Sequence, residues 1–449
     1  MTHQDTLGNA MSGASAAAIE TYEQALHELQ CYIGDPVATI DRALDDSPDF
    51  VMGHVLRAYL HLLGTEAAGL PVARAAYEAA RQWPANTRER GHLSVIAHLL
   101  EGEWHAAGRD LEDIAIDHPR DALALQAGHL VDFYTGASRM LRDRIARALP
   151  AWSPAMPGYH ALLGMHAFGL EETGLYGRAE AAGRRAVEME PRDGWAQHAV
   201  AHVMEMQGRQ RDGIAWMRAN AEAWSQESFF CVHNWWHLAL YHLDLDEVDE
   251  VLALYDGPIY GSRSQVTLDM VDACALLWRL RLRDIDVGDR WQVLADAWEP
   301  LATAGNYAFN DVHAMMAFVG ADRPQAAQAV LEAQERALRG SGDNVRFTRA
   351  VGAPVTRAIK AFAEGDYAES VRLLRPVRNS AHHFGGSHAQ RDLIDLTLIE
   401  AALRAGQFAL ARALAAERAD LKPTSPTGHT FLRRARDTVI ARVASQVRH

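Results

Sequence analysis

Apolar residues along this chain recur every three to four positions, in segments separated by short polar turns. This spacing is the period of an amphipathic α-helix, and no segment shows the sustained alternation of a β-strand. Glycines end several of the segments at intervals of 38, 34, 38 and 34 residues, at Gly64, Gly102, Gly136, Gly174 and Gly208. A period of about 34 residues is that of a tetratricopeptide unit, two antiparallel helices joined by a turn. The pattern predicts an all-α, right-handed tetratricopeptide-like superhelix of antiparallel helix pairs.

Proline followed by a capping acid separates successive pairs, as in Pro119-Arg120-Asp121 and Pro191-Arg192-Asp193. Proline cannot continue a helix, and an acid at the next helix start caps free N–H groups. A less regular stretch at Gly257-Pro258 interrupts the array. We therefore expect three segments: a frayed lead-in over residues 1–20, N-terminal repeats with a histidine-rich inner wall over 21–256, and C-terminal repeats over 257–449 that pack on or continue the array.

Composition narrows the classes of partner. The 449 residues carry 44 Lys and Arg against 58 Asp and Glu, a formal charge of −14, which disfavours nucleic acid and anionic membranes. No secretory signal and no apolar run of about 18 residues is found, so we expect no membrane span. The three distant cysteines, Cys31, Cys231 and Cys274, suggest neither a disulfide framework nor a cysteine zinc site. These features predict a cytoplasmic protein.

The densest chemistry lies in residues 158–242, where helices rich in His, Trp and acid each precede a plainer helix. His198, His202 and Glu205 stand at i, i+4 and i+7, which places them on one helix face. His233 and His237 repeat that spacing one repeat later. We expect no cofactor, with zinc as the alternative if His198, His202, His233 and His237 meet, because zinc takes imidazole ligands.

The same residues have two metal-free interpretations. Half-buried histidines that hydrogen-bond to acids and backbone groups are common in repeat proteins. A histidine oriented by a carboxylate is also a general base near neutral pH. We take as catalytic candidates His198, His202, Glu205, His233, His237, Asp269 and Asp272, with Glu171 and Glu172 as further carboxylates.

Other polar and aromatic residues fall where a helical array would turn them inward. The candidates for ligand binding are His129, Asp132, His160, His166, Trp195, Asn234, Trp235, Tyr241, Asn310, His313, His388 and Arg391. Each has a structural alternative: tryptophan in repeats is usually core, and Arg391 could form an ion pair with Asp392 or Asp395.

Three segments resemble the tetratricopeptide repeat protein 38 family: His233-Asn234-Trp235-Trp236-His237, the segment from His198 to Gly208, and that from Pro157 to Glu172. The resemblance extends over roughly Tyr22 to Arg434. It implies a tetratricopeptide-like superhelix and supplies no catalytic residues.

Two functions fit these observations. The first is a small-molecule-binding protein, an enzyme of the hydrolase or lyase type that uses His and carboxylate acid–base chemistry in an enclosed polar cavity. The second is a scaffold that binds a partner peptide in its concave groove. A groove that clamps acidic peptide ends should show Lys, Arg and Asn, whereas this wall shows His, Asp and Glu, so we rank the enzyme first. A homo-oligomer fits either function.

Overall fold

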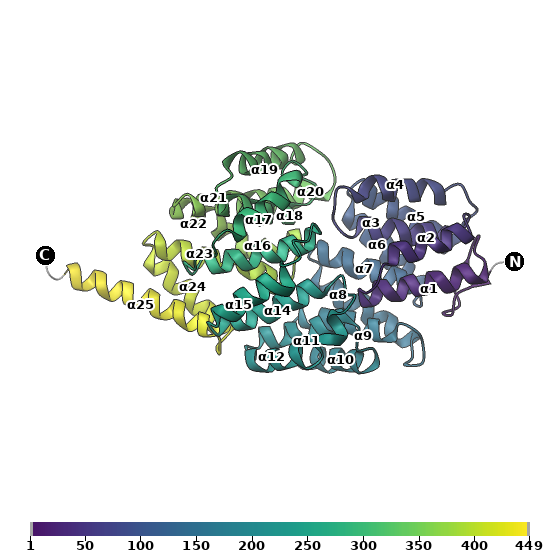
Figure 1. Ribbon diagram of the computed structural model, residues 1–449, viewed down its shortest axis with the longest axis horizontal. Helices are drawn as coiled ribbons and strands as arrows, with labels where there is room; N and C mark the ends of the chain where they lie inside the picture. The colour runs from purple at the N-terminus through teal and green to yellow at the C-terminus, as the bar shows by residue number, and fades with distance from the viewer. Residues whose placement is uncertain (1–2, 447–449) are drawn as a thin grey trace. The chain divides into compact units, whose positions relative to one another are not determined.

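The computed structural model describes residues 3–446, and this part of the chain is helical almost throughout (Figure 1). The only strands within it, β1 (His3–Gln4) and β2 (Ala10–Met11), form one short antiparallel pair. Consecutive helices joined by short turns pack along one another, as in α1 with α2, α3 with α4, and α21 with α22. The predicted all-α, tetratricopeptide-like array of helix pairs is therefore confirmed. No helix among the described residues combines the length and apolar character needed to cross a membrane.

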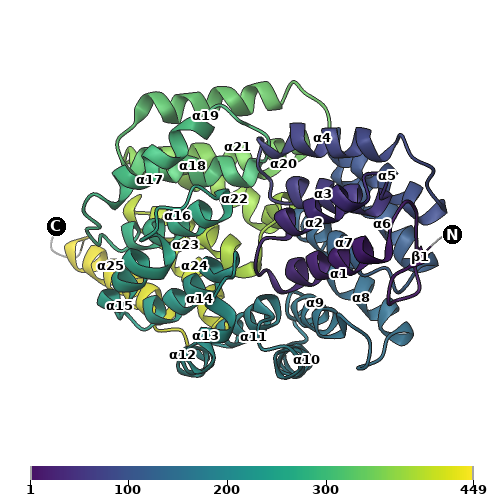
Figure 2. The ribbon, with the colours of Figure 1, turned by 45° about the vertical axis from the view of Figure 1, so that its right-hand side comes forward.

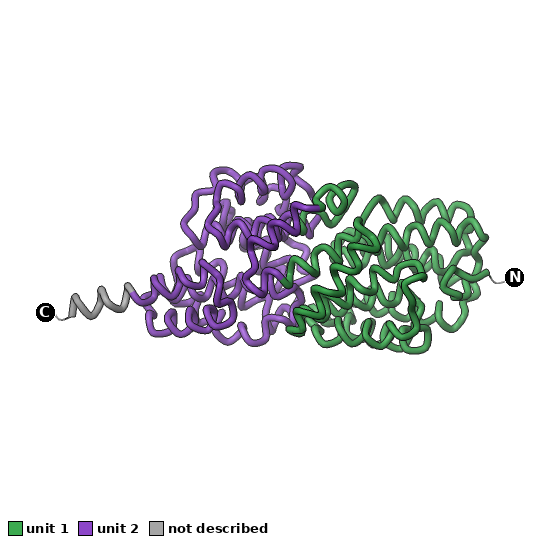
Figure 3. The backbone as a smooth tube through the Cα atoms, turned by 90° about the horizontal axis from the view of Figure 1, so that it is seen from below, with its two compact units in different colours: residues 1–203, 220–234, 340–345 green, residues 204–219, 235–339, 346–449 purple. Residues whose placement is uncertain are grey.

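The described residues form two compact units, coloured separately in Figure 3. Unit 1 comprises residues 1–203, 220–234 and 340–345, and unit 2 comprises residues 204–219, 235–339 and 346–449. The division expected at residue 256 stays a prediction. Helix α11 (Gly194–Met206) and helix α14 (Cys231–Asp244) have residues in both units.

Unit 1 contains the N-terminal helix pairs, which Figure 2 shows from a second side. Its other helices are α1 (Ala16–Cys31), α2 (Pro36–Asp46), α3 (Val51–Leu62), α4 (Gly69–Ala80), α5 (Thr87–Leu100), α6 (Trp104–Asp117), α7 (Ala122–Tyr134), α8 (Ser138–Ala148), α9 (Tyr159–Glu171), α10 (Tyr176–Met189) and α13 (Ala221–Ser225). The segment 340–345 joins this unit because the backbone N–H of Asp343 donates to the carbonyl of Gly102, at 2.8 Å.

Unit 2 contains the later pairs. Its helices are α12 (Gln210–Ala219), α15 (Val248–Leu254), α16 (Thr267–Arg281), α17 (Arg290–Trp298), α18 (Ala308–Gly320), α19 (Pro324–Ala337), α21 (Ala353–Ala363), α22 (Tyr367–Val377), α23 (His388–Arg404), α24 (Phe408–Leu421) and α25 (Pro426–Gln446). Helix α20 (Asp343–Phe347) again has residues in both units.

The first twenty residues differ from the expected frayed lead-in, because residues 3–20 form β1, β2 and the start of α1. Arg88 donates to the backbone carbonyl of Ala10 at 2.9 Å, and the backbone N–H of Ser12 donates to Glu89 Oε1 at 2.8 Å. Both partners lie at the start of α5. Their side chains bind the backbone of the N-terminal segment, a long-range interaction that the hydrophobic pattern does not encode.

The acid of the first Pro-Arg-Asp turn does more than cap a helix. Asp121 Oδ1 accepts the backbone N–H of Ala124 and so caps α7, as the sequence predicts. Its other oxygen accepts hydrogen bonds from Arg88 at 2.7 Å and His92 at 2.9 Å, both on α5. Burial would raise the pKa of Asp121, but His92 and Arg88 outweigh it and hold that pKa far below its usual value.

The second Pro-Arg-Asp turn repeats this arrangement. Asp193 Oδ1 accepts the backbone N–H of Ala196 at the start of α11, and Oδ2 accepts from His160 Nδ1 on α9 at 2.8 Å. Each of these acids thus ties the first helix of one pair to the first helix of the preceding pair. The turn motif sets both the helix start and the stacking of neighbouring repeats.

Candidate binding sites

Within unit 1 the structure brings together His198, His202 and His233, which the sequence predicted as metal ligands. His198 and His202 on α11 are 1% and 0% exposed, and their ring centroids are 4.3 Å apart. His233 on α14 places its Nε2 atom 3.1 Å from Nε2 of His198. Phe168 packs against His198 with ring centroids 5.4 Å apart, so an aromatic wall borders the imidazoles.

Two carboxylates border the same group. Glu171, the last residue of α9, and Glu172, which follows it, are 0% and 5% exposed. Glu171 Oε2 lies 3.7 Å from Nδ1 of His202, and ligand atoms of Glu171, Glu172 and His202 all lie within 4.8 Å of one another. Carboxylate and imidazole groups are therefore concentrated around His202.

Two other candidates in unit 1 have structural surroundings. The buried carboxylate of Asp132 accepts two hydrogen bonds from Arg144, at 2.7 and 3.0 Å, and forms a buried ion pair. Burial and the nearby Arg144 charge lower the pKa of His129 to about 3. The ring of His129 packs edge-on against Trp195, with centroids 5.4 Å apart.

The remaining unit 1 candidates are spread over several contacts. His160 binds Asp193 as described, and burial lowers the pKa of His166 on α9. Trp195 is 5% exposed within an aromatic cluster that includes a stacked contact with Tyr32. Asn234 donates to the backbone carbonyl of Gly194 at 3.1 Å. These candidates of unit 1 therefore make contacts on several different helices.

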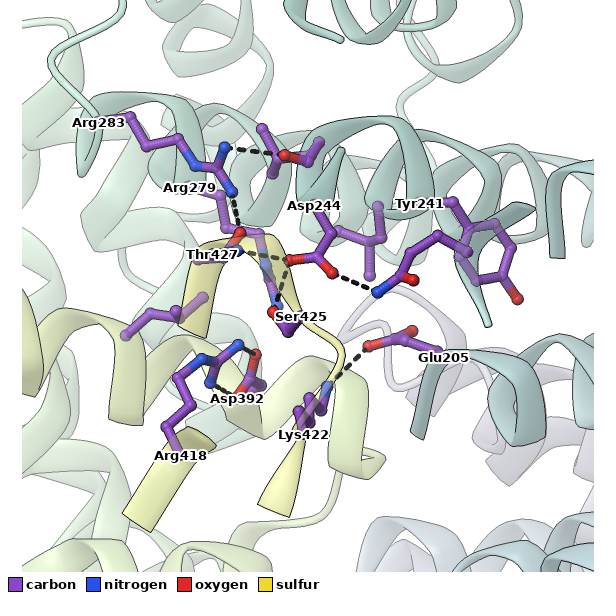
Figure 4. A pocket seen from close by; sticks show the side chains of 14 residues that line it. Glu205, Tyr241, Asp244, Arg279, Arg283, Asp392, Arg418, Lys422, Ser425 and Thr427 are labelled. Atoms are coloured by element: carbon purple, nitrogen blue, oxygen red, sulfur yellow. Dashed lines mark hydrogen bonds and ion pairs between the residues drawn. The ribbon is translucent and has the colours of Figure 1, made fainter. Parts of the chain in front are cut away.

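Unit 2 contains a pocket of about 50 Å³ formed by α11, α12, α14, α16, α23, α24 and the turn before α25 (Figure 4). Its lining carries four cationic side chains and three carboxylates. The lining residues are Glu205, Gln210, Leu240, Tyr241, Leu243, Asp244, Arg279, Arg283, Asp392, Leu396, Arg418, Lys422, Ser425 and Thr427. Of these, only Glu205 and Tyr241 were candidates from the sequence.

Arg279 is the most deeply buried cation of this pocket, at 4% exposure. Its guanidinium donates to the backbone carbonyls of Ala275 at 2.9 Å and Ala389 at 2.7 Å, and lies 5.2 Å from the ring centroid of Trp236. Burial lowers the pKa of Arg279. Among the described residues its hydrogen-bond acceptors are thus neutral carbonyls, and no carboxylate binds this guanidinium directly.

Two ion pairs occupy the side of the pocket formed by α23 and α24. Arg418 donates two hydrogen bonds to Asp392, at 2.5 and 2.9 Å, and Lys422 Nζ lies 3.6 Å from Glu205 Oε1 (Figure 4). Burial would raise the pKa of Asp392, but Arg418 and Lys422 outweigh it and hold that pKa well below its usual value. Burial also acts to raise the pKa of Glu205, yet Lys422 and a hydrogen bond from His237 lower it overall.

Asp244 orders the opposite side of the pocket. Its carboxylate accepts hydrogen bonds from the Gln210 amide and from Ser425 Oγ, the latter at 2.8 Å. Arg283 donates to the Leu243 carbonyl and to Thr427 Oγ1, each at 2.8 Å. These contacts fix the turn between α24 and α25 against α14, and so hold Lys422 beside the pocket.

The other unit 2 candidates lie in several places. His237 Nδ1 is 3.2 Å from Glu205 Oε2. His313 on α18 donates from Nδ1 to the backbone carbonyl of Phe309 in the same helix, at 2.8 Å. Burial lowers the pKa of His313 to about 4, and Asp272 on α16 counteracts this. Asn310 is buried on α18 beside His313, Asp269 and Trp235 are half-buried, and His388 begins α23.

Asp392 and Asp395, the two carboxylates considered as partners of Arg391, each bind another arginine. Asp392 binds Arg418, and Asp395 binds Arg378 at 3.2 Å, while Arg391 donates to the carbonyl of Gly386. Helix spacing alone favoured the local partners. The arginines that bind these two carboxylates lie on neighbouring elements, whose register the sequence pattern does not give.

The cationic side chains of the pocket were not among the residues predicted from the sequence. Arg279 lies near the end of α16, whereas Arg418 lies on α24 and Lys422 follows that helix directly. The sequence held one indication, because the chain has only two lysines, Lys360 and Lys422. In the structure Lys422 is 7% exposed. Lysine is almost never so buried unless it is paired. We expected a wall without Lys and Arg, and this counted against a peptide clamp. That expectation is wrong for this pocket, whose lining contains both residue types.

No family model matches the chain. Similar solved structures include yeast Tom70, at 12% sequence identity and a TM-score of 0.32, with 96% of this chain and 91% of that chain covered. Another is an IFIT1 monomeric mutant with Gppp-AAAA, at 13% identity and a TM-score of 0.40, with 95% of this chain and 96% of that chain covered. A third is Naa15/Naa10 bound to HypK-THB, at 11% identity and TM-score 0.26 over 94% and 68%. Values this low carry no argument about ligand or activity. The helices themselves define the class, an all-α, tetratricopeptide-like helical-repeat protein.

Proposed function

We propose that this protein is a non-catalytic helical-repeat scaffold that binds a partner peptide by holding one of its carboxylate groups in the unit 2 pocket. The observation that supports the proposal is the Arg279 guanidinium, which is buried at the pocket and hydrogen-bonded to two backbone carbonyls. A buried cation is costly unless an anion compensates it. A ligand carboxylate would supply that charge and form charge-assisted hydrogen bonds, which are about twice as strong as neutral ones.

The size of the pocket favours part of a ligand over a whole small molecule. Sites for drug-sized molecules span about 300–1,000 Å³. The unit 2 pocket, at about 50 Å³, has room for roughly three to five water-sized groups. A carboxylate at a peptide end or on an acidic side chain fits such a space, while the rest of the peptide lies outside it.

The acid–base enzyme, ranked first on the sequence, becomes the second hypothesis. Glu205 and His237 bind each other, and Lys422 adds a positive charge that keeps Glu205 ionised. A general base needs an accessible acceptor close to its substrate proton. Glu205 and His237 are thus better suited to binding a charged group of a ligand than to acid–base catalysis. Membership in the tetratricopeptide repeat protein 38 family is likewise a proposal, supported by the His233 to His237 motif and the helical-pair fold.

Substitution of Lys422 tests the proposed binding site. Random peptides with free C-terminal carboxylates would be selected on the full chain, and the affinity of a selected peptide measured by fluorescence anisotropy. Lys422→Gln removes one cation and keeps a side chain of similar length. Loss of one charge-assisted contact of about 1.5–3 kcal/mol weakens binding roughly 10- to 100-fold.

Lys360→Gln is the matched control, because Lys360 lies on α21 in the same unit, pairs with Glu364 and is not part of the pocket lining. It should leave the affinity unchanged. Equal affinities for the two variants, or a library without enriched peptides, would contradict the proposed site.

A further inference from the structure

The imidazoles of unit 1 have the spacing of metal ligands. His198, His202 and His233 each offer a ring nitrogen within 4.8 Å of the others. Zinc binds imidazole nitrogen at about 2.0–2.1 Å with tetrahedral geometry, so two such nitrogens lie about 3.3 Å apart. The 3.1 Å separation of Nε2 in His198 and His233 is close to that value. Three possible donors from two helices therefore lie within 4.8 Å of one another.

The carboxylate beside His202 supports the same conclusion. Glu171 and Glu172 group with His202, while His198, His202 and His233 belong to a second group of possible ligands. Glu171 Oε2 lies 3.7 Å from Nδ1 of His202, so a metal ion held by this ring would be bound through its Nε2 atom. Metal-binding histidines commonly present their other ring nitrogen to a carboxylate, which fixes the ring and strengthens the ligand.

We propose that unit 1 binds a divalent transition-metal ion of the zinc type through His198, His202 and His233, with Glu171 as the positioning residue for His202. Nitrogen donors select zinc and its neighbours over calcium and magnesium, which prefer oxygen ligands. A divalent cation would also compensate the charge of the buried Glu171 and Glu172 carboxylates. Three protein ligands leave one coordination position for water or another donor. The proposal concerns unit 1 and is independent of the peptide site in unit 2.

Metal content of the untagged full chain tests this site. The protein would be stripped with a chelator, reloaded with Zn²⁺, freed of excess metal and analysed for its elements. We expect about one equivalent of zinc for a zinc-type site. Less than about a tenth of an equivalent would overturn the proposal and leave a hydrogen-bonded histidine cluster.

The zinc content of single-residue variants tests whether these residues bind the ion. His202→Gln should lose the bound zinc, whereas His166→Gln should keep it, because His166 is a buried histidine on α9 outside the group of ligands. Glu171→Gln should retain the site but weaken zinc affinity about 10- to 100-fold, as expected of a carboxylate that orients a ligand. Equal zinc content in His202→Gln and His166→Gln would overturn the assignment.

Cobalt keeps the test valid if His202→Gln fails to fold. Co²⁺ added to the stripped parent protein should give the intense visible absorption of four- or five-coordinate cobalt, and Zn²⁺ should displace it. Only the weak absorption of hydrated, octahedral cobalt would contradict an imidazole site.

Discussion

Asp121→Ala is expected to destabilise the protein by about 3–5 kcal/mol, the cost of removing one partner of a buried ion pair. Arg88 and Asp121 have side chains only 4% and 2% exposed, so the substitution leaves the guanidinium buried without its carboxylate. It also removes the hydrogen bond to His92 and the cap of α7. Urea denaturation at pH 7, followed by far-ultraviolet circular dichroism, measures the loss.

Asp143→Ala is the control for this prediction, since Asp143 pairs with Arg139 and Arg142 at the surface of the same unit. Exposed ion pairs contribute about 0–1 kcal/mol. Similar losses for Asp121→Ala and Asp143→Ala would show that the Pro-Arg-Asp turn does not tie the repeats together.

Asp311→Asn is expected to stabilise the protein above pH 7 and to have little effect near pH 4. Burial raises the pKa of Asp311 on α18 to about 7, and a hydrogen bond with Gln334 counteracts this only in part. A folded-state pKa above the unfolded value of 3.8 means that stability is fully present below pH 3.8 and is lost as the pH rises towards 7. Such a shift corresponds to a difference on the order of 4 kcal/mol.

Denaturation of the parent and of Asp311→Asn between pH 4 and pH 8 checks the sign and the window. The difference in free energy of unfolding should grow over this range and then level off. Asp420→Asn, on the exposed face of α24 in the same unit, should show no such pH-dependent difference. A difference that shrinks as the pH rises would mean that Asp311 is ionised in the folded state at acidic pH.

The fold could be predicted because helices end at residues that the local sequence specifies, most often glycine. Gly102, Gly136, Gly174 and Gly208 take φ values of 73°, 68°, 76° and 66°, as a glycine after a helix end does. Gly64 is the exception: the left-handed residue there is its neighbour Thr65, with φ 58°. The periodicity of the sequence thus located the helix pairs. It did not determine that Thr65, and not Gly64, takes the left-handed conformation after α3.

The proximity of the unit 1 histidines could be predicted because two of them share a helix face and the third repeats their spacing one repeat later. The spacing of His198 and His202 placed them together, and His233 one repeat later completed the group in unit 1. The unit 2 pocket instead joins Glu205, Arg279 and Lys422 from elements far apart in the sequence. Only tertiary packing determines which first and second helices supply such a pocket.

The most direct test of the account compares one selected peptide in two chemical forms. The first keeps all carboxylates, and the second carries a C-terminal amide with Asn and Gln in place of Asp and Glu. Binding to the unmodified full chain is measured by isothermal titration calorimetry at low and at moderate ionic strength. The account predicts that the neutral form binds at least about 10-fold more weakly, since charge-assisted hydrogen bonds are lost. Equal affinity of the two forms would contradict a carboxylate-binding pocket.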